Sequence, residues 1–210
     1  MLTLSVLDQS VVSFGQPEDA SIRHTLALAE HCESLGYARF WVSEHHNLPS
    51  IAGTAPEVLL AAIAARTQRI RLGSAGIMLP HYSAYKVAEQ FRVLEALAPG
   101  RIDWGLSTGS TARSTMGLTR VKQADMEEYI RIVRALLNGE TPEWTFEDKR
   151  RKIRFMDPVN VPAHNLKDPL PLHISAFGPK GRALIARQKA GFIDAPGSPE
   201  QSKLNVDEVK

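Results

Sequence analysis

The stretch of this sequence best suited to chemistry is a short apolar run that ends in polar side chains. The run from Arg39 to Val42 is followed by Ser43 and then by Glu44-His45-His46-Asn47. Histidine exchanges protons near neutral pH, so this segment could supply an acid or a base. The pattern is typical of a buried strand that opens into a site, because parallel α/β folds collect their chemistry at the carboxyl ends of strands. A polar loop after a core strand is the alternative interpretation.

Three further segments could contact a ligand. The small residues from Gly73 to Gly76 would let a flat ligand approach the backbone, although tight strand packing in a barrel explains them equally well. The hydroxyl-rich segment from Ser107 to Arg113 could surround an anion with backbone amides, or be a flexible connector. From Phe177 to Arg182 a strand turns into a helix, whose first amides and dipole favour an anion.

The sequence gives no indication of a metal site. Cys32 is the only cysteine, which excludes an internal disulfide and any zinc site built on cysteines, and we expect it to be a small core residue. The histidines outside the first stretch have no mutual spacing typical of metal ligands; they include His24, His81, His164 and His173. His173 lies inside a predicted strand, where it could face the interior or bond a backbone carbonyl.

Composition places the chain among ordinary globular proteins. Its 210 residues are 43% hydrophobic and 23% charged, with a formal charge of +2. Such a balance gives no reason to expect nucleic acid or an anionic membrane as a partner, and the basic run Arg150-Arg151-Lys152 fits a solvated hairpin tip. We see no signal peptide and no apolar run near the roughly 20 residues that span a bilayer. The expectation is a soluble, cytoplasmic protein.

Strand-like and helix-like segments alternate along the chain. Thr54-Ala55-Pro56-Glu57 fits a capping box at the start of one helix. The predicted strands are Leu2 to Leu7, Arg39 to Ser43, a segment beginning at Ile70, Arg101 to Leu106, Leu170 to Ala176 and the opening of a sixth at Phe192 to Ala195. The predicted helices run from Pro17 to Leu35, from Thr54 through Ile63, from Ala84 to Ala98, from about Lys122 to Leu137 and from Phe177 to Ala190.

This alternation predicts a parallel sheet with right-handed crossovers. The first strand leads into Asp8-Gln9-Ser10-Val11, which lacks the glycine-rich fingerprint of a Rossmann domain. A (β/α)₈ barrel fits better, although it needs eight strands and about 250 residues. The chain ends after about five βα units. The barrel is therefore incomplete, or a partner finishes it, or the sheet stays open.

Two segments depart from the repeating pattern. Trp144-Thr145-Phe146 and Ile153-Arg154-Phe155 flank a charged turn, which predicts a β-hairpin inserted within a segment near residues 140–170. Residues 196–210 are polar and show no helical or strand period, so we expect a tail. The predicted organisation is one partial barrel domain over residues 1–195 followed by that tail.

The order of these motifs resembles the bacterial luciferase-like, flavin-dependent monooxygenase superfamily. The resemblance covers roughly residues 1–195, and its blocks occur in the order found in the family. They are Phe40 to Asn47, Ala55 to Leu59, Arg69 to Pro80, Val87 to Arg92 and Pro99 to Asp103. The resemblance implies a (β/α)₈ TIM barrel, here C-terminally truncated, with the family's insertion around the fourth and fifth strands.

The resemblance also implies roles for particular residues. His45 matches the family's acid/base beside the flavin, and Glu44 could orient or charge it, or could serve only in packing. Ala75-Gly76 lies where the family has a non-proline cis peptide behind the flavin ring. Ser107 and Thr108 stand where luciferases carry a cysteine and a phosphate-binding arginine, a departure that puts light emission in doubt. The turn that holds the flavin phosphate corresponds to Phe177, Gly178 and Gly181, with Lys180 and Arg182 adding charge.

The expected activity is oxidation of a small organic substrate by reduced FMN and O₂, with the flavin supplied by a separate reductase. An F420-dependent hydride-transfer oxidoreductase on the same scaffold is the first alternative. A truncated, non-catalytic remnant or subunit that binds flavin weakly is the second. Since an open barrel exposes strand edges, we expect a homo-oligomer or completion by another chain.

Overall fold

A parallel, curved sheet forms the centre of the molecule in the computed structural model, which describes residues 3–78, 81–155, 167–195 and 198–209. Its strands follow one another in sequence order, and every neighbouring pair is parallel. The strands are β1 (Ser5–Asp8), β2 (Arg39–Val42), β3 (Arg71–Ser74), β5 (Ile102–Ser107), β8 (Leu172–Ser175) and β9 (Gly191–Ile193), and β4 (Ile77–Met78) also pairs with β5.

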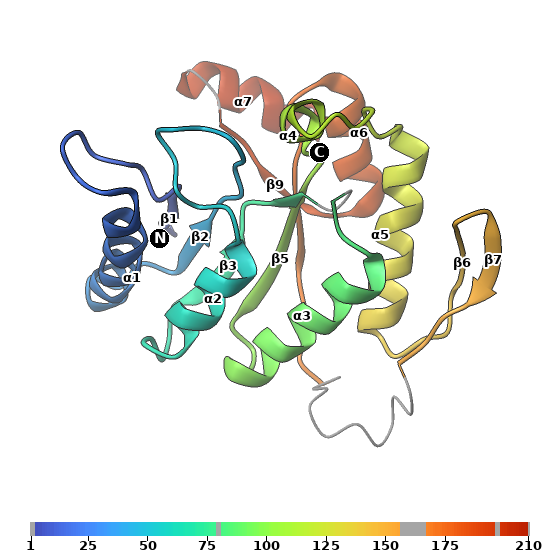
Figure 1. Cartoon of the computed structure of the whole chain (residues 1–210), viewed down its shortest axis with the longest axis horizontal. Coiled ribbons are helices and arrows are strands. Elements are labelled where there is room, and N and C mark those ends of the chain that lie inside the picture. The colour runs from blue at the N-terminus through green and yellow to red at the C-terminus, as the bar shows by residue number, and fades with distance from the viewer. Residues whose placement is uncertain (1–2, 79–80, 156–166, 196–197, 210) are drawn as a thin grey trace.

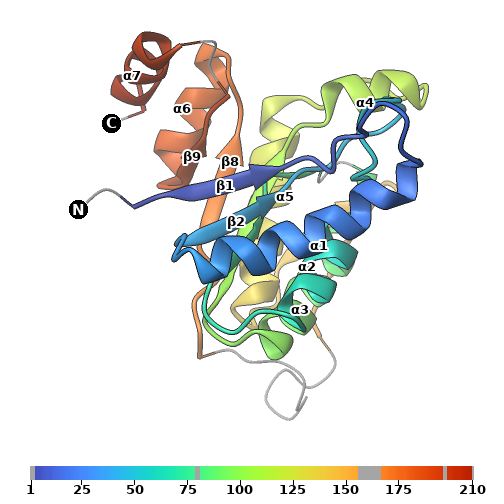
Figure 2. The same ribbon diagram turned by 90° about the vertical axis from the view of Figure 1, so that its left-hand side faces the viewer.

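Helices form an outer layer in which neighbours in sequence pack against one another (Figure 1). The sheet curves so that residues of its first strand, β1, and its last, β9, line one interior cavity; Figure 2 shows β1 crossing in front of β8 and β9. The helices are α1 (Glu18–Ser34), α2 (Pro56–Ala64), α3 (Ala84–Leu97), α4 (Ser110–Thr115), α5 (Gln123–Leu137), α6 (Pro179–Gln188) and α7 (Pro199–Asp207). The predicted barrel-type α/β fold is confirmed, as an incomplete barrel.

The main core lies between the sheet and the helices. Alternate residues of a strand point to opposite faces, so one set on each strand faces the helices. Phe40, Leu72, Ile102 and Trp104 belong to this set and are fully buried. Helix α5 presents buried residues at helical spacing to the same core, as does α3. Burying each large side chain contributes about 1.5–3 kcal/mol, and this layer holds the strand ends in place.

The other face of the sheet fills the barrel interior. Trp41 and His173 meet there edge to face, with ring centroids 4.9 Å apart. Glycine stands beside each of them: a Cβ on Gly73 would lie 2.2 Å from the Trp41 ring, and a Cβ on Gly191 would lie 2.1 Å from the His173 ring. His173 therefore faces the interior, which was one of the two expectations for it.

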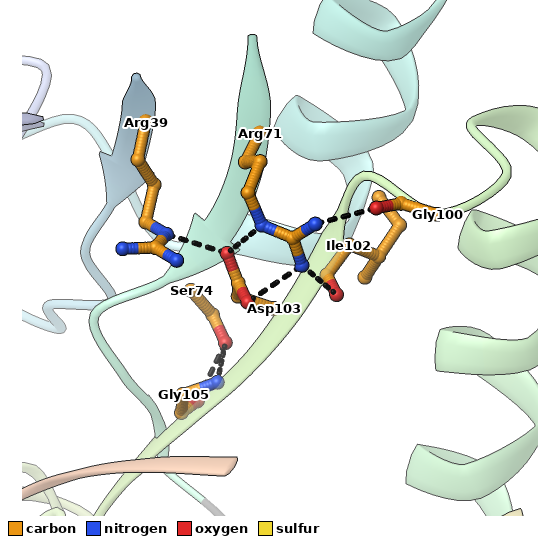
Figure 3. A network of polar contacts seen from close by, with 7 residues as sticks. All are labelled: Arg39, Arg71, Ser74, Gly100, Ile102, Asp103 and Gly105. Atoms are coloured by element: carbon orange, nitrogen blue, oxygen red, sulfur yellow. Dashed lines mark hydrogen bonds and ion pairs between the residues drawn. The ribbon is translucent and has the colours of Figure 1, made fainter. Parts of the chain in front are cut away.

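A buried ionic network beside Trp41 ties three strands together (Figure 3). The carboxylate of Asp103 on β5 is fully buried and accepts hydrogen bonds from Arg39 Nε at 2.6 Å and from Arg71 Nε and Nη2 at 3.0 and 2.9 Å. Arg71 also donates to the carbonyls of Gly100 and Ile102. Charged bonds of this kind are stronger than neutral ones, so the network fixes β2, β3 and β5 relative to one another.

The predicted capping box at Thr54 was wrong. Helix α2 begins at Pro56, its N-cap residue is Ala55, and no side chain bonds the first-turn amides. Thr54 stands one residue too early to cap. The carboxylate of Glu57 accepts a bond from Gln90 Nε2 at 3.4 Å, and burial raises its pKa.

The predicted absence of regular structure after residue 195 was also wrong. Pro199–Asp207 form helix α7, and the Ser198 hydroxyl caps it by accepting from the Gln201 amide at 3.2 Å. Asn205 on this helix donates to the Asp194 carboxylate, which joins α7 to the end of β9. The signal that was missed is Ser198 followed by proline and, three residues on, by glutamine.

The predicted hairpin is present as β6 (Glu143–Phe146) and β7 (Lys149–Lys152). Its second strand lies earlier than expected, because Glu147 and Asp148 both take positive φ and close a two-residue turn. The hairpin projects from the body of the molecule beyond α5 (Figure 1). The part of the predicted insertion at 156–166, with His164, lies outside the described residues. None of the described helices combines the length and apolarity needed to cross a membrane.

Candidate active site

A cavity of about 430 Å³ lies at the carboxyl ends of the strands. It is lined by residues that follow β1, β2, β3, β5 and β8, which the parallel sheet brings to one edge. Most residues proposed for the site from the sequence line this cavity: Glu44, His45, Ala75, Gly76, Ser107, Thr108 and Phe177. Those that follow Phe177 in the turn do not: Gly178, Lys180, Gly181 and Arg182. Side chains from segments more than 100 residues apart thus meet where the sequence pattern placed them.

One wall of the cavity is the break between β3 and β4. The Ala75–Gly76 peptide bond is cis, as the resemblance implied. Gly73 lies opposite Asp103, and Ile77 lies opposite Leu106. Four residue steps along the β3–β4 segment therefore match three steps along β5, so the β3–β4 segment contains one extra residue. The Ser74 hydroxyl bridges the gap, donating to the Gly105 carbonyl at 2.5 Å and accepting from the Gly105 amide at 3.1 Å (Figure 3).

The same wall has no room for a side chain at Gly76. A Cβ there would lie 2.4 Å from the carbonyl carbon of Leu106 and 2.7 Å from its Cα, and backbone atoms cannot move aside cheaply. Ser107 reaches the wall from β5, with its hydroxyl 3.5 Å from the Gly76 carbonyl oxygen. Ala75, with a single methyl group, and Gly76, with no side chain, thus form a wall of small residues facing the cavity.

His45 points into this cavity from the end of β2. Its backbone amide donates to the Gly53 carbonyl at 2.9 Å, and its Nε2 lies 3.0 Å from the side-chain nitrogen of Gln9. The amide nitrogen can only donate, so Nε2 accepts and the ring proton is on Nδ1. The pKa of His45 lies below its ordinary value, mainly because burial disfavours the charged ring; the charge of His46 lowers it further and that of Glu44 opposes both. His45 is thus a neutral imidazole at pH 7.

Glu44 is fully buried, and its hydrogen bonds run away from His45. The carboxylate accepts from the Met78 amide at 2.7 Å, from the Tyr82 hydroxyl at 2.8 Å and from His46 Nε2 at 2.6 Å. These contacts anchor β4, the strand that follows the cis bond. Glu44 influences His45 by its charge alone, and His46 bonds Glu44 without lining the cavity.

The turn from Phe177 into α6 lies at the rim. Phe177 is 53% exposed and lines the cavity, and Gly178 is the N-cap residue of the helix. No side chain caps the first-turn amides of α6, which leaves them available to an anion. Arg182 is not free for that purpose, because it pairs with Glu208 at 2.5 Å and also donates to the Phe177 carbonyl. A Cβ on Gly181 would lie 2.6 Å from that of Ala176, so glycine lets the helix start close to β8.

Sequence reasoning missed Gln9 and Tyr82. Gln9 directly follows β1, on the same sheet edge as the end of β2, so the rule that strand ends meet could have identified it. Tyr82 carries no local signal, because it reaches Glu44 only through the fold. Its pKa is raised strongly by burial and by Glu44, so its hydroxyl stays protonated and donates.

The buried histidines predict a dependence of stability on pH. The pKa values of His45, His81 and His173 are all lowered, chiefly by burial. Below about pH 6.5, the ordinary pKa of histidine, these side chains bind protons in the unfolded chain but not in the folded chain. Stability is therefore full above that pH and is lost as the pH falls toward the lowered pKa values of the folded chain. We expect the free energy of unfolding in urea to fall between pH 7.5 and 5.5, by at most about 1.4 kcal/mol per pH unit for each proton. A His173→Asn variant should show a shallower fall, and equal stability at both pH values would contradict the assignment.

The sequence of this chain is similar to those of known proteins. The family profile described as luciferase-like monooxygenase matches residues 2–210. The uncharacterized protein YwcH of Bacillus subtilis is 63% identical over 106 residues, which are 50% of this chain and 32% of that protein. The N-acetyl-S-alkylcysteine monooxygenase of the same organism is 58% identical over 106 residues, with the same coverage of 50% and 32%. The matched segment thus spans about a third of each of these relatives.

Solved structures share the fold over the whole chain. The crystal structure of apo-MsnO8 has a TM-score of 0.82 and 29% identity, covering 100% of this chain and 60% of its own. The oxygenating constituent of 3,6-diketocamphane monooxygenase from Pseudomonas putida, in complex with FMN, has a TM-score of 0.80 and 17% identity, covering 99% and 61%. An F420-dependent secondary alcohol dehydrogenase has a TM-score of 0.69 and 18% identity, covering 99% and 64%.

Proposed function

The chain belongs to the luciferase-like monooxygenase family, and we propose that it uses reduced FMN and O₂ to oxidise a small organic substrate. One observation carries this proposal: His45 and the small residues Ala75 and Gly76 line the same cavity. A flat ring needs a flat wall, and a proton-transfer step needs a neutral imidazole beside it.

The residues present fit a flavin. Any side chain at Gly76 would collide with the backbone of Leu106, so β5 packs directly against the segment that lines the cavity. Phe177 and Met78 add apolar side chains to the lining of the cavity, and Ser107 and Thr108 add residues that carry hydroxyls. At the rim, the uncapped amides at the start of α6 would bind the phosphate, with Gly178 as the N-cap residue. The bound flavin would supply the oxygen chemistry.

This chain contributes positioning and a proton. His45 Nε2 accepts from Gln9, which leaves Nδ1–H free to donate a hydrogen bond to a ligand. Because burial keeps the ring neutral, Nε2 can take a proton from the substrate once Gln9 is displaced, and the imidazolium so formed can give that proton back. Glu44 holds β4 behind the wall through the Met78 amide. The protein thus fixes the acid/base at one side of the cavity and the flat wall at another.

The finer features of the reaction come from relatives. Since the Bacillus enzyme named N-acetyl-S-alkylcysteine monooxygenase shares 58% identity over the matched segment, we propose an alkyl thioether as the substrate class. A separate flavin reductase would supply reduced FMN. The F420-dependent alcohol dehydrogenase favours a second candidate, hydride transfer with F420, although its TM-score of 0.69 lies below the 0.80 of the FMN complex.

The proposal is tested by incubating the protein with an N-acetyl-S-alkylcysteine. Oxidised product should form only when reduced FMN and O₂ are both supplied, and the yield should exceed that of free reduced FMN. Anaerobic samples and samples with oxidised FMN are the controls. Product formation with reduced F420 and no O₂ would support hydride transfer instead, and binding of neither cofactor would reject both candidates.

A substitution at Gln9 tests how the His45 ring is positioned. Replacing Gln9 with leucine removes one hydrogen bond to the His45 ring while keeping the side-chain bulk. Such a bond contributes about 0.5–1.5 kcal/mol, so turnover should fall about twofold to tenfold. The acid limb of the pH–rate profile should also move, because His45 Nε2 loses its donor. Gln68→Leu, an exposed change, is the matched control, and an unchanged profile in Gln9→Leu would exclude a role for Gln9 in positioning.

A further inference from the structure

A second group of polar side chains adjoins the cavity at Glu44, and the proposed function uses only part of it. Glu44, His46 and His81 each offer one ligand atom, and these atoms all lie within 4.8 Å of one another. Glu44 and His46 follow β2, whereas His81 lies between β4 and α3. The histidine rings contact each other edge to face, with centroids 5.5 Å apart.

His81 is the member of this group whose buried position is not explained by hydrogen bonds. Its side chain is only 6% exposed, and both ring nitrogens are buried without a hydrogen-bond partner within the described chain. A buried polar atom left in this way costs about 1–3 kcal/mol, so such groups are rare without a function. Nδ1 of the ring lies 3.9 Å from Glu44 Oε1, too far for a hydrogen bond and close enough for both atoms to bind one ion.

The distances suit a small divalent cation. Zinc bonds of about 2.0–2.1 Å in tetrahedral geometry set neighbouring ligand atoms about 3.3 Å apart. Glu44 Oε1 lies 2.6 Å from His46 Nε2 and 3.9 Å from His81 Nδ1. One distance is shorter than that value and the other is longer. Small side-chain rotations would equalise them.

The other contacts of Glu44 would remain as support. Its Oε2 accepts from the Met78 amide, and the Tyr82 hydroxyl donates to the carboxylate. Bonds of this second layer orient metal ligands and are common around zinc. The carboxylate is fully buried, and among the described residues it forms ion pairs with His46 and His81, so a bound cation would compensate its charge.

We propose that Glu44, His46 and His81 bind one divalent transition-metal ion, of the class that two imidazoles and a carboxylate select, with zinc as the reference. A water would complete the tetrahedron. The ion would join the end of β2 to the segment after β4 and thereby brace the wall that contains Ala75 and Gly76. No motif in the sequence indicates this site, because His81 is 35 residues from His46.

Zinc binding to the metal-free protein, followed by isothermal titration calorimetry, tests this site. We expect one Zn²⁺ per chain in the wild type, and a loss of affinity of more than about tenfold in His81→Phe, which keeps a ring in the pocket. Cobalt binding supplies a second readout, because a tetrahedral site gives visible absorption bands that the variant should lack. His31→Ala removes an exposed histidine and is the matched control.

The outcomes are distinguishable. Tight, stoichiometric binding that His81→Phe weakens and His31→Ala leaves intact supports the site. Absence of Zn²⁺ binding, or equal binding in the wild type and in His81→Phe, overturns it. Should His81→Phe fail to fold by circular dichroism, His46→Gln provides the same comparison. None of these measurements depends on flavin, so failure of the metal site leaves the proposed oxidation untouched.

Discussion

Replacing His45 with glutamine is expected to lower turnover by about 100-fold to 10,000-fold, the usual contribution of a positioned acid or base. Glutamine keeps a polar side chain of similar reach and cannot exchange a proton near pH 7. Because the ring is neutral and lines the cavity, we expect the loss in kcat, with FMN affinity within about threefold of the wild type. The measurement is thioether oxidation with reduced FMN, together with an FMN titration of each protein.

His24→Gln is a suitable control, since His24 is an exposed residue of α1 that does not line the cavity. It should retain full turnover. A His45→Gln protein that oxidises substrate at the wild-type rate would remove His45 from the chemistry, even if flavin still bound.

The second large effect is expected for stability. Replacing Asp103 with alanine leaves Arg39 and Arg71 without their shared carboxylate inside the barrel. Breaking a buried ion pair costs about 3–5 kcal/mol. Since the two guanidinium groups keep 26% and 31% of their surface in contact with water, we expect the lower end of that range. The melting temperature should fall by roughly 6–12 °C, because each kcal/mol corresponds to about 2–4 °C in a chain of this size.

An exposed ion pair of the same chemistry provides the comparison. Arg131 and Glu128 on α5 are 2.7 Å apart with 51% and 48% of their side chains exposed. Glu128→Ala should change stability by less than about 1 kcal/mol. If Asp103→Ala and Glu128→Ala melt at the same temperature, the interior network does not hold β2, β3 and β5 together.

Much of the fold was predictable because strands and helices differ in period and end at recognisable residues. The apolar run before Glu44 and the small residues before Gly76 identified two strand ends, and parallel topology then required them to share one edge. The cavity lined by His45 and Gly76 follows from that rule. Local sequence was sufficient there because each residue needed only its position on a strand.

Other features depend on contacts between distant residues. The partners of Glu44 are Met78, Tyr82 and His46, and no spacing in the chain predicts the first two. Likewise, Arg39 and Arg71 share Asp103 only because the register of three strands aligns them. The error at α7 was of another kind: a short capped helix was present in the sequence, and low hydrophobicity concealed it.

The claim that a flavin ring rests on the Ala75–Gly76 wall beside His45 is tested most directly by a crystal structure of the protein soaked with FMN. We predict electron density for the ring system in van der Waals contact with Ala75 and Gly76, the His45 imidazole at its edge and the phosphate at the first turn of α6. Density for FMN elsewhere, or a His45 ring turned away from the bound flavin, would contradict the account.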